Sequence, residues 1–541
     1  MTKNKLILIG LLAAFIFILE FTFFNQLFFE DVNLLYFSKG ILKSGFFIGS
    51  YVAALISISL LFFIRNKYIF IMSSFIALIS YIITTSYRLI NGHGFGLNEL
   101  QVMIHESNKF SIDVWNSYSS LLLKGFGFIV FFLLIAFLIR RFINKNDLHI
   151  PTPFVVTSFL FSLGLALIVV FKTVNTNILY PAPINLVSTL IYYVNNAPYR
   201  GERENLTEKP TSPAIYKNII WMVDESIGGK YLSINGYEKE TTPFLSSIKD
   251  KYINLGIASS TANCSAESNL ILMSGIQLSQ IPDQDFHALK KANIFQYAKN
   301  AGFTTHYISG QSHDDLLQNY MTSFDLESID DFYQPPTNFK NEIIPEGDII
   351  NRIKKTLANG KKNFIYVVKR GAHFHWEGQY PKSKTIFKPA LKPSDNLILE
   401  NKEKALNSYA NAVRYKVDDF FKSFYEITDF SNDKSTLIIY TSDHGQSIIE
   451  GNSFATHCDG LNPNGTQGDV PLLLFTNVSK NLFKNAQVNK HSNYQIFPTT
   501  LDLMGYKTHH GKSILAGPEK EQLFFSGDLF GRTHTQKNAI D

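Results

Sequence analysis

The sequence predicts a two-part protein: an N-terminal five-helix transmembrane domain and a C-terminal α/β domain with a mainly parallel sheet covered by helices on both faces. Hydrophobic residues make up 45% of the 541 residues, and they concentrate before about residue 175. After residue 215, short apolar runs alternate with helical patterns, which is typical of a parallel sheet with helices packed on it. We therefore expect a membrane domain at 1–175, an interfacial helix and linker at 176–214, and an α/β domain at 215–541.

Five segments of the first part are long and apolar enough to cross a bilayer, since a spanning helix needs roughly 20 apolar residues. They are Leu6–Phe24, Ile41–Ile64, Tyr68–Ile90, Leu121–Ile139 and Val155–Phe171. The first resembles a signal peptide, but no small-residue cleavage site follows it, so an uncleaved helix is expected. Glu20 lies near the end of this span, where it is expected to extend to the interface; a functional role is the alternative.

The basic residues of the short loops predict how these spans are oriented. Three loop regions share one side of the membrane, and they contain Lys3, Lys5, Arg65, Lys67, Arg140, Arg141 and Lys145. Such a bias marks the cytoplasmic side. An odd number of spans then places everything after residue 171 outside the cytoplasm.

Charge and cysteine content exclude some classes of protein. The net charge of +5 is small for this length, and the globular part has no run of basic residues, which argues against nucleic-acid binding. The two cysteines, Cys264 and Cys458, cannot form a disulfide framework. Each lies beside a polar motif, so they either pair in an oxidising compartment or are two unrelated buried side chains.

The second part begins with an expected interfacial helix at Ile184–Val194. Five short apolar runs then predict buried strands: Ile219–Val223, Thr304–Ser309, Phe364–Val368, Leu437–Tyr440 and Leu472–Phe475. Two segments between them, Ala288–Ala301 and Lys404–Ile427, have the apolar spacing of helices.

Polar side chains follow several of these predicted strands. Glu225, Ser309, His373, Asp443 and His444 all come at or just after a strand end. Ligands of parallel α/β sheets bind at the carboxyl ends of the strands. We therefore expect these residues to belong to a single site.

The residue types in this set indicate a divalent metal. Asp443 and His444, followed by a glycine, offer an oxygen and an imidazole in one turn, which suits Zn²⁺. Glu225 either binds the same cation or caps a helix. His373 and His457 are further candidate ligands, although His375 lies close to the first of them.

A hydroxyl nucleophile is expected near this metal. Ser265 lies in the small polar stretch Ser259–Ser268, which leads into the apolar Leu270–Met273. The start of a helix favours anions, and a metal that lowers the pKa of bound water from about 15.7 to about 7 can activate a hydroxyl. Thr261 and the neighbouring serines compete with Ser265. No Walker-type loop is present in the sequence, so nucleoside triphosphates are not expected.

Three stretches carry a family resemblance: VDESIGGKYLSINGYEKETTP at Val223–Pro243, NSYANAVRYKVDDFF at Asn407–Phe421, and SDHGQS at Ser442–Ser447. With five spans ahead of them, the chain resembles membrane-bound phosphoethanolamine transferases of the alkaline phosphatase/sulfatase superfamily over nearly its whole length. The resemblance implies a sulfatase-like fold for the α/β domain. It also implies one zinc ion bound by Glu225, Asp443, His444 and the nucleophile oxygen, with a second zinc possible.

The resemblance also assigns the remaining site residues. The family's nucleophile, usually Thr, is followed by Ala and three positions on by Ser; Ser265 fits that frame, whereas Thr261-Ala262 keeps the usual residue types and is the rival. His373 and His457 would contact the phosphate or a second metal. A loop that contains Lys in relatives reads Gly310–Asp314 here without Lys; Gln311 and His313 are its candidates for substrate or metal contacts.

The implied activity is transfer of phosphoethanolamine from phosphatidylethanolamine to a hydroxyl or phosphate of an envelope glycolipid or glycan, through a covalent phospho-Ser/Thr intermediate. A monomer in the bacterial inner membrane with a periplasmic catalytic domain is expected. A glycerol-phosphate transferase and a sulfatase-like phosphodiesterase are the alternatives. A sulfatase motif would need an Arg that Cys264–Ser268 lacks, and a non-enzymatic scaffold would be expected to have lost ligands.

Overall fold

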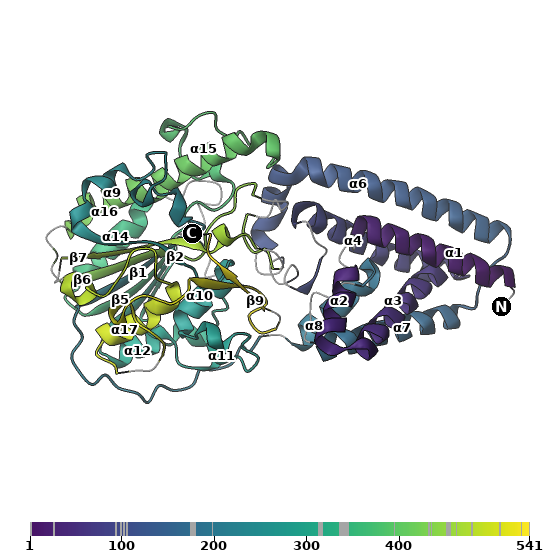
Figure 1. Ribbon diagram of the computed structural model, residues 1–541, viewed down its shortest axis with the longest axis horizontal. Coiled ribbons are helices and arrows are strands. Elements are labelled where there is room, and N and C mark those ends of the chain that lie inside the picture. The colour runs from purple at the N-terminus through teal and green to yellow at the C-terminus, as the bar shows by residue number, and fades with distance from the viewer. Residues whose placement is uncertain are drawn as a thin grey trace. The chain divides into compact units, whose positions relative to one another are not determined.

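The chain folds into two compact units, one of residues 1–197 and one of residues 198–451 with 455–541 (Figure 1). The computed structural model describes residues 3–24, 28–91, 95–97, 100, 103, 107–173, 180–196, 198–311, 317–334, 346–393, 395–430, 433, 435–450, 456–460, 463–477, 480–507, 510–531 and 533–539.

The first unit is a bundle of apolar helices. Its helices are α1 (Lys3–Leu19), α2 (Phe28–Lys39), α3 (Ile41–Leu61), α4 (Lys67–Asn91), α6 (Ser107–Lys145), α7 (Thr152–Thr173) and α8 (Ala182–Asn195). Five stretches in them are long and apolar enough to cross a membrane: Lys5–Thr22, Ile41–Leu61, Lys67–Leu89, Leu122–Lys145 and Thr152–Lys172. The five predicted spans are confirmed, with ends that shift by a few residues. The helix expected at Ile184–Val194 is also present, as α8.

Polar groups inside this unit bond to one another. The Ser57 hydroxyl lies 2.8 Å from that of Ser162, which links α3 to α7. Glu20, in a π-helical turn that follows α1, accepts hydrogen bonds from the Tyr81 hydroxyl (2.7 Å) and the Ala182 backbone N–H (3.2 Å). Its side chain is buried within the unit, so the expectation that it extends to the interface is wrong. Burial without such partners would cost several kcal/mol.

The second unit is built on a seven-stranded sheet in the order β2-β7-β6-β1-β5-β3-β4. All pairs among β6, β1, β5, β3 and β4 are parallel, and β7 runs antiparallel to both β6 and β2. The strands are β1 (Asn218–Asp224), β2 (Tyr252–Ser259), β3 (Thr304–Ser309), β4 (Asp331–Tyr333), β5 (Asn363–Val368), β6 (Thr436–Ser442) and β7 (Asp469–Thr476). A separate hairpin pairs β8 (Leu523–Gly527) with β9 (Thr533–Lys537).

Helices cover both faces of this sheet (Figure 1). One face carries α9, α14, α15 and α16, and the other carries α10, α11, α12 and α17. The helices described in this unit are α9 (Pro243–Ser247), α10 (Ser265–Ser274), α11 (His287–Lys290), α12 (Ile294–Asn300), α13 (Ser323–Leu326), α14 (Glu346–Leu357), α15 (Lys402–Val413), α16 (Phe420–Thr428) and α17 (Ile496–Leu503). Because both faces are covered, every residue of β1, β5 and β6 is buried.

The predicted strands and helices are present, with several differences, and β4, β8 and β9 were not predicted. The predicted run Leu472–Phe475 is β7, but it is antiparallel, so the sheet is mixed rather than wholly parallel. The helix expected over Ala288–Ala301 is divided into α11 and α12 because Asn293 caps the second part, accepting hydrogen bonds from the backbone N–H groups of Phe295 and Gln296. Strand β2 was not predicted, since its polar and glycine residues interrupt the apolar pattern.

Candidate metal centre

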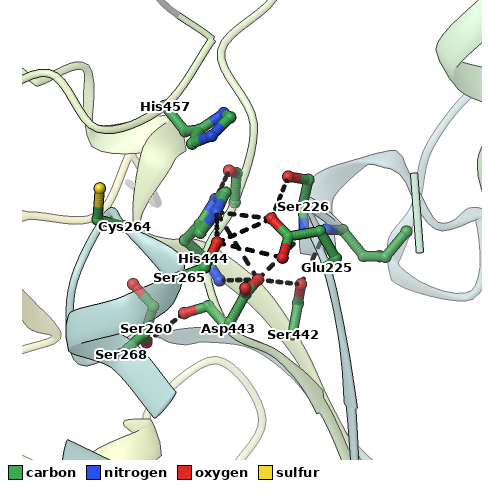
Figure 2. Close-up of polar contacts among 12 residues, drawn as sticks. Glu225, Ser226, Ser260, Cys264, Ser265, Ser268, Ser442, Asp443, His444 and His457 are labelled. Atoms are coloured by element: carbon green, nitrogen blue, oxygen red, sulfur yellow. Dashed lines mark hydrogen bonds and ion pairs between the residues drawn. The ribbon is translucent and has the colours of Figure 1, made fainter. Parts of the chain in front are cut away.

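The register of the sheet brings two carboxylates together. Strand β1 pairs with β6 so that Asp224 lies opposite Ser442. The next residue on each strand, Glu225 and Asp443, therefore emerges at the same edge. Both side chains are buried, and Figure 2 shows them pointing toward each other beside His444. The register of β1 and β6 therefore explains why these two side chains, predicted at strand ends, lie close together.

Glu225 lies at the centre of the cluster. Its Oε1 accepts hydrogen bonds from the hydroxyls of Ser226 (3.0 Å) and Ser265 (2.9 Å) and lies 3.1 Å from His444 Nε2. Its Oε2 accepts from Gln311 Nε2 at 2.8 Å. Both oxygens of Glu225 therefore accept hydrogen bonds from side chains of the cluster, and none of these donors is a backbone N–H group at the start of a helix.

Ser265 is the hydroxyl directed at this carboxylate. It is the first residue of α10, and its Oγ lies 2.9 and 3.1 Å from the two Glu225 oxygens and 3.1 Å from His444 Nε2. Asn269, one turn later, donates to the Ser265 carbonyl at 2.8 Å. The rival Thr261 is fully buried, and its hydroxyl bonds to Ser268 at 2.9 Å. The structure thus brings Ser265, and not Thr261, to the cluster.

Two more histidines lie beside the carboxylates. The His457 ring stacks on that of His444 with centroids 4.5 Å apart, and the His373 ring lies 5.9 Å from His457. His375 instead has its ring nitrogen 3.8 Å from Glu377. Of the two neighbouring histidines, His373 is therefore the one in the cluster.

Two glycines allow the chain to approach this closely. Gly371 has φ +51°, and a Cβ there would lie 2.1 Å from the Glu225 carbonyl oxygen. A Cβ on Gly445, which follows His444, would lie 2.3 Å from the Thr466 carbonyl oxygen. Both positions therefore exclude any side chain.

The side chains of the cluster strongly shift one another's pKa values. Burial alone would raise the pKa of Glu225, but the hydrogen bond and charge of His444 hold it well below its usual range. Burial and the neighbouring Glu225 charge raise the pKa of Asp443 well above its usual range. Burial lowers the pKa of His444, yet Asp443 and Glu225 together raise it to about 9. Burial and the other two histidines lower the pKa of His457.

The donor atoms fit a metal ion. Ligand atoms of Glu225, Asp443 and His444 lie within 4.8 Å of one another, and the same is true of Glu225, His373 and His457. Among the described residues, Asp443 Oδ2 is buried and has no hydrogen-bond partner, which a bound cation would explain. Two carboxylates, an imidazole and a hydroxyl form a donor set suited to zinc.

The remaining predicted residues are placed differently. Gln311 contacts Glu225, whereas His313 lies outside the described residues. Cys264 and Cys458 form a disulfide with their Cα atoms 4.7 Å apart. This bond joins the residue before Ser265 to the residue after His457.

Three contributors were missed from the sequence. Ser226 has φ +59°, and its backbone N–H bonds to Asp443 Oδ1 at 3.1 Å. The Tyr409 hydroxyl donates to the Ser226 carbonyl at 2.7 Å. Lys369, fully buried, forms an ion pair with Asp224 at 2.9 Å. A lysine directly after the apolar run Phe364–Val368 could have signalled Lys369, and Ser226 and Tyr409 lie in two of the stretches that carry the family resemblance.

Comparisons with known proteins identify the family of the α/β unit. The sulfatase family model matches residues 217–506, more than half of the chain. Kdo(2)-lipid A phosphoethanolamine 7''-transferase of Escherichia coli strain K12 is 27% identical over 235 residues, which cover 43% of this chain and 39% of that enzyme. The chain thus spans about two-fifths of the length of this curated relative.

Two solved structures share the fold. The integral membrane lipooligosaccharide phosphoethanolamine transferase A (EptA) from Neisseria meningitidis aligns with a TM-score of 0.62 at 18% identity, covering 94% of this chain and 98% of that chain. The C-terminal periplasmic domain of EcEptC from Escherichia coli, in complex with Zn, aligns with a TM-score of 0.52 at 17% identity, covering 62% of this chain and 96% of that chain. The first match extends over both the helical and the α/β parts.

Proposed function

Because the chain belongs to the sulfatase family, we propose that it is a zinc-dependent phosphoethanolamine transferase. The donor is phosphatidylethanolamine, and the acceptor is a hydroxyl or phosphate of an envelope glycolipid or glycan. The names of its relatives support the transferred group, and one of them acts on Kdo(2)-lipid A. Five apolar helices support a lipid donor, since they would keep the α/β unit attached to a bilayer.

The observation that carries this proposal is the position of one hydroxyl. Ser265 Oγ lies about 3 Å from both oxygens of Glu225 and from His444 Nε2, at the first turn of α10. A serine with no acceptor for its proton is a poor nucleophile. Here its proton already points at a carboxylate, and the free N–H groups at the start of α10 favour an anion next to it.

Glu225, Asp443, His444 and Ser265 are the residues that would hold zinc. When bound, the ion would act as a Lewis acid that offsets negative charge on the phosphoryl group and lowers the pKa of a nearby hydroxyl. His373 and His457 would either contact the phosphoryl oxygens or, together with Glu225, hold a second ion.

The reaction then proceeds in two displacements. Ser265 Oγ forms a bond to phosphorus and loses its proton, which passes to the diacylglycerol oxygen as the bond between that oxygen and phosphorus breaks. Diacylglycerol leaves with a proton, and phosphoethanolamine stays on Ser265. The acceptor oxygen next attacks phosphorus on the same group and gives up its own proton, and Ser265 regains its hydroxyl. The Asn269 side-chain amide, which donates to the Ser265 carbonyl, and the Ser226 backbone N–H, which donates to Asp443, keep the reacting groups in place.

We propose the inner membrane of a bacterium as the location, with the α/β unit in the periplasm. Basic loop residues support this orientation. The Cys264–Cys458 disulfide supports an oxidising compartment.

Transfer from labelled phosphatidylethanolamine by the purified full-length protein tests the proposal. Ser265→Ala should abolish transfer, and Thr261→Val, which removes a hydroxyl bonded elsewhere, should leave it nearly unchanged. After incubation with the donor alone, mass spectrometry should find one phosphoethanolamine group on the Ser265 peptide. Normal transfer by Ser265→Ala, or an adduct on another residue, would contradict the assignment.

A further inference from the structure

Gln311 uses both hydrogens of its side-chain amide to join two parts of the site. Its Nε2 donates to Glu225 Oε2 at 2.8 Å and to the Lys369 backbone carbonyl at 2.9 Å. The side chain is buried, with 9% of its surface exposed. An amide nitrogen has two hydrogens, and these two acceptors can take one each.

This contact differs in kind from the contacts that Ser265 and His444 make with Glu225. Ser265 and His444 are the reacting hydroxyl and a metal-type ligand, and their bonds to Glu225 must change when either changes its proton or its partner. A glutamine amide neither gains nor loses a proton near neutral pH. Gln311 therefore remains a donor to Glu225 whatever the state of the site.

The second acceptor of Gln311 is itself held firmly. The Lys369 backbone N–H donates to the Val223 carbonyl at 2.8 Å, and its side-chain nitrogen pairs with Asp224 at 2.9 Å. Both members of that ion pair are fully buried. The carbonyl that anchors Gln311 is thus fixed at the junction of β1 and β5.

The backbone around Gln311 is fixed in the same way. Gly310 donates from its N–H to the Val368 carbonyl at 2.7 Å, which ties the turn after β3 to the end of β5. The Ser309 hydroxyl accepts from the Gln311 N–H at 3.3 Å. With its backbone bonded to β5 and β3, the side chain spans directly from Lys369 to Glu225.

We propose that Gln311 is a positioning residue, which fixes the plane of the Glu225 carboxylate for metal binding and does not contact the substrate. Groups that orient a metal ligand typically change metal affinity 10–100-fold when they are removed. The inference rests on the proposed function only in taking zinc as the ion that Glu225 holds.

Zinc affinity of the full-length protein, measured by competition with a chelator, tests this inference. Gln311→Met keeps the length of the side chain and removes both donors, and it should weaken zinc binding roughly 10–100-fold. Gln495→Met is the matched control, because Gln495 is another buried glutamine of the same unit that donates to the Gly517 carbonyl at 2.9 Å. It should leave zinc affinity unchanged. Melting curves of the zinc-free proteins separate a loss of metal binding from a loss of folding.

Kinetics with phosphatidylethanolamine supply the second readout. Added zinc should restore the kcat of Gln311→Met, and the KM for the lipid should then equal that of the wild type. Unchanged zinc affinity with a raised KM would overturn the inference and make Gln311 a substrate contact. If the wild type bound zinc but transferred nothing from this lipid, while Gln311→Met still bound zinc more weakly, the proposed function would fail and the inference would stand.

Discussion

The disulfide between Cys264 and Cys458 should contribute a large share of the stability of the α/β unit. It joins residues 194 positions apart, and it connects the start of α10 to the segment that contains His457. The perturbation is the double substitution Cys264→Ser with Cys458→Ser, which keeps side chains of similar size and removes only the cross-link.

The expected magnitude follows from the length of the closed loop. A cross-link over about 194 residues removes enough chain entropy from the unfolded state to stabilise the fold by about 5 kcal/mol, and measured disulfides typically contribute about 2–4 kcal/mol. The loop keeps other contacts, since the Cys458 N–H still bonds to the Asn263 carbonyl at 2.9 Å and Asn263 to the Asp459 carbonyl at 2.9 Å. The variant should therefore fold, with a stability lower by about 2–5 kcal/mol.

Thermal unfolding of the full-length protein in mild detergent measures this loss. At about 2 °C per kcal/mol, the midpoint should fall by roughly 4–10 °C. Fluorescence of Trp221 and Trp376, both fully buried in this unit, reports the transition. Reductant should lower the wild-type midpoint to that of the double variant and leave the variant itself unchanged. A variant that melts within 1 °C of the wild type would refute the reasoning.

Two further predictions concern buried charges and use the same melting assay. Lys369→Met leaves Asp224 buried without its ion-pair partner and should destabilise the unit by about 3–5 kcal/mol, whereas adding Asp224→Asn should recover most of this; equal midpoints for the single and double variants would contradict that. Burial raises the pKa of Asp418 to about 6, against hydrogen bonds from the Leu245 and Phe244 backbone N–H groups. Because the pKa is raised in the fold, the protonated carboxyl contributes stability below pH 4. This contribution is lost as the pH rises to 6. The free energy of unfolding of Asp418→Asn should therefore rise relative to that of the wild type by at most about 3 kcal/mol between pH 4 and 7. A difference in stability that does not change with pH would exclude this titration.

The candidate site could be located from the sequence because parallel strands end at one edge. Glu225 and Asp443 follow two apolar runs, and the pairing of β1 with β6 makes their meeting a consequence of backbone register. The antiparallel direction of β7 could not be foreseen in this way. The apolar run Leu472–Phe475, in a strand whose eight residues are all buried, looks the same in either direction.

Side-chain direction is what the sequence left open. Ser265 and Thr261 are four residues apart, and only the start of α10 at Ser265 decides that one hydroxyl faces Glu225 while the other bonds to Ser268. Gln311 was expected to contact the substrate or a metal, and its amide reaches Glu225 because the turn after β3 is bonded to β5. Such contacts depend on the packing of elements far apart in the chain.

The paired carboxylates explain why this edge of the sheet suits a cation. Two buried carboxylates close together cannot both stay ionised without a positive partner, so the pKa of Glu225 falls while that of Asp443 rises. His444 supplies part of the compensation, with its Nε2 3.1 Å from Glu225 and 3.8 Å from Asp443. A divalent ion supplies more charge than one imidazolium, and it would allow both carboxylates to ionise with His444 neutral. Metal binding and deprotonation of this cluster are therefore linked equilibria. A group that orients Glu225, as proposed for Gln311, affects both the metal affinity and the protonation of the cluster.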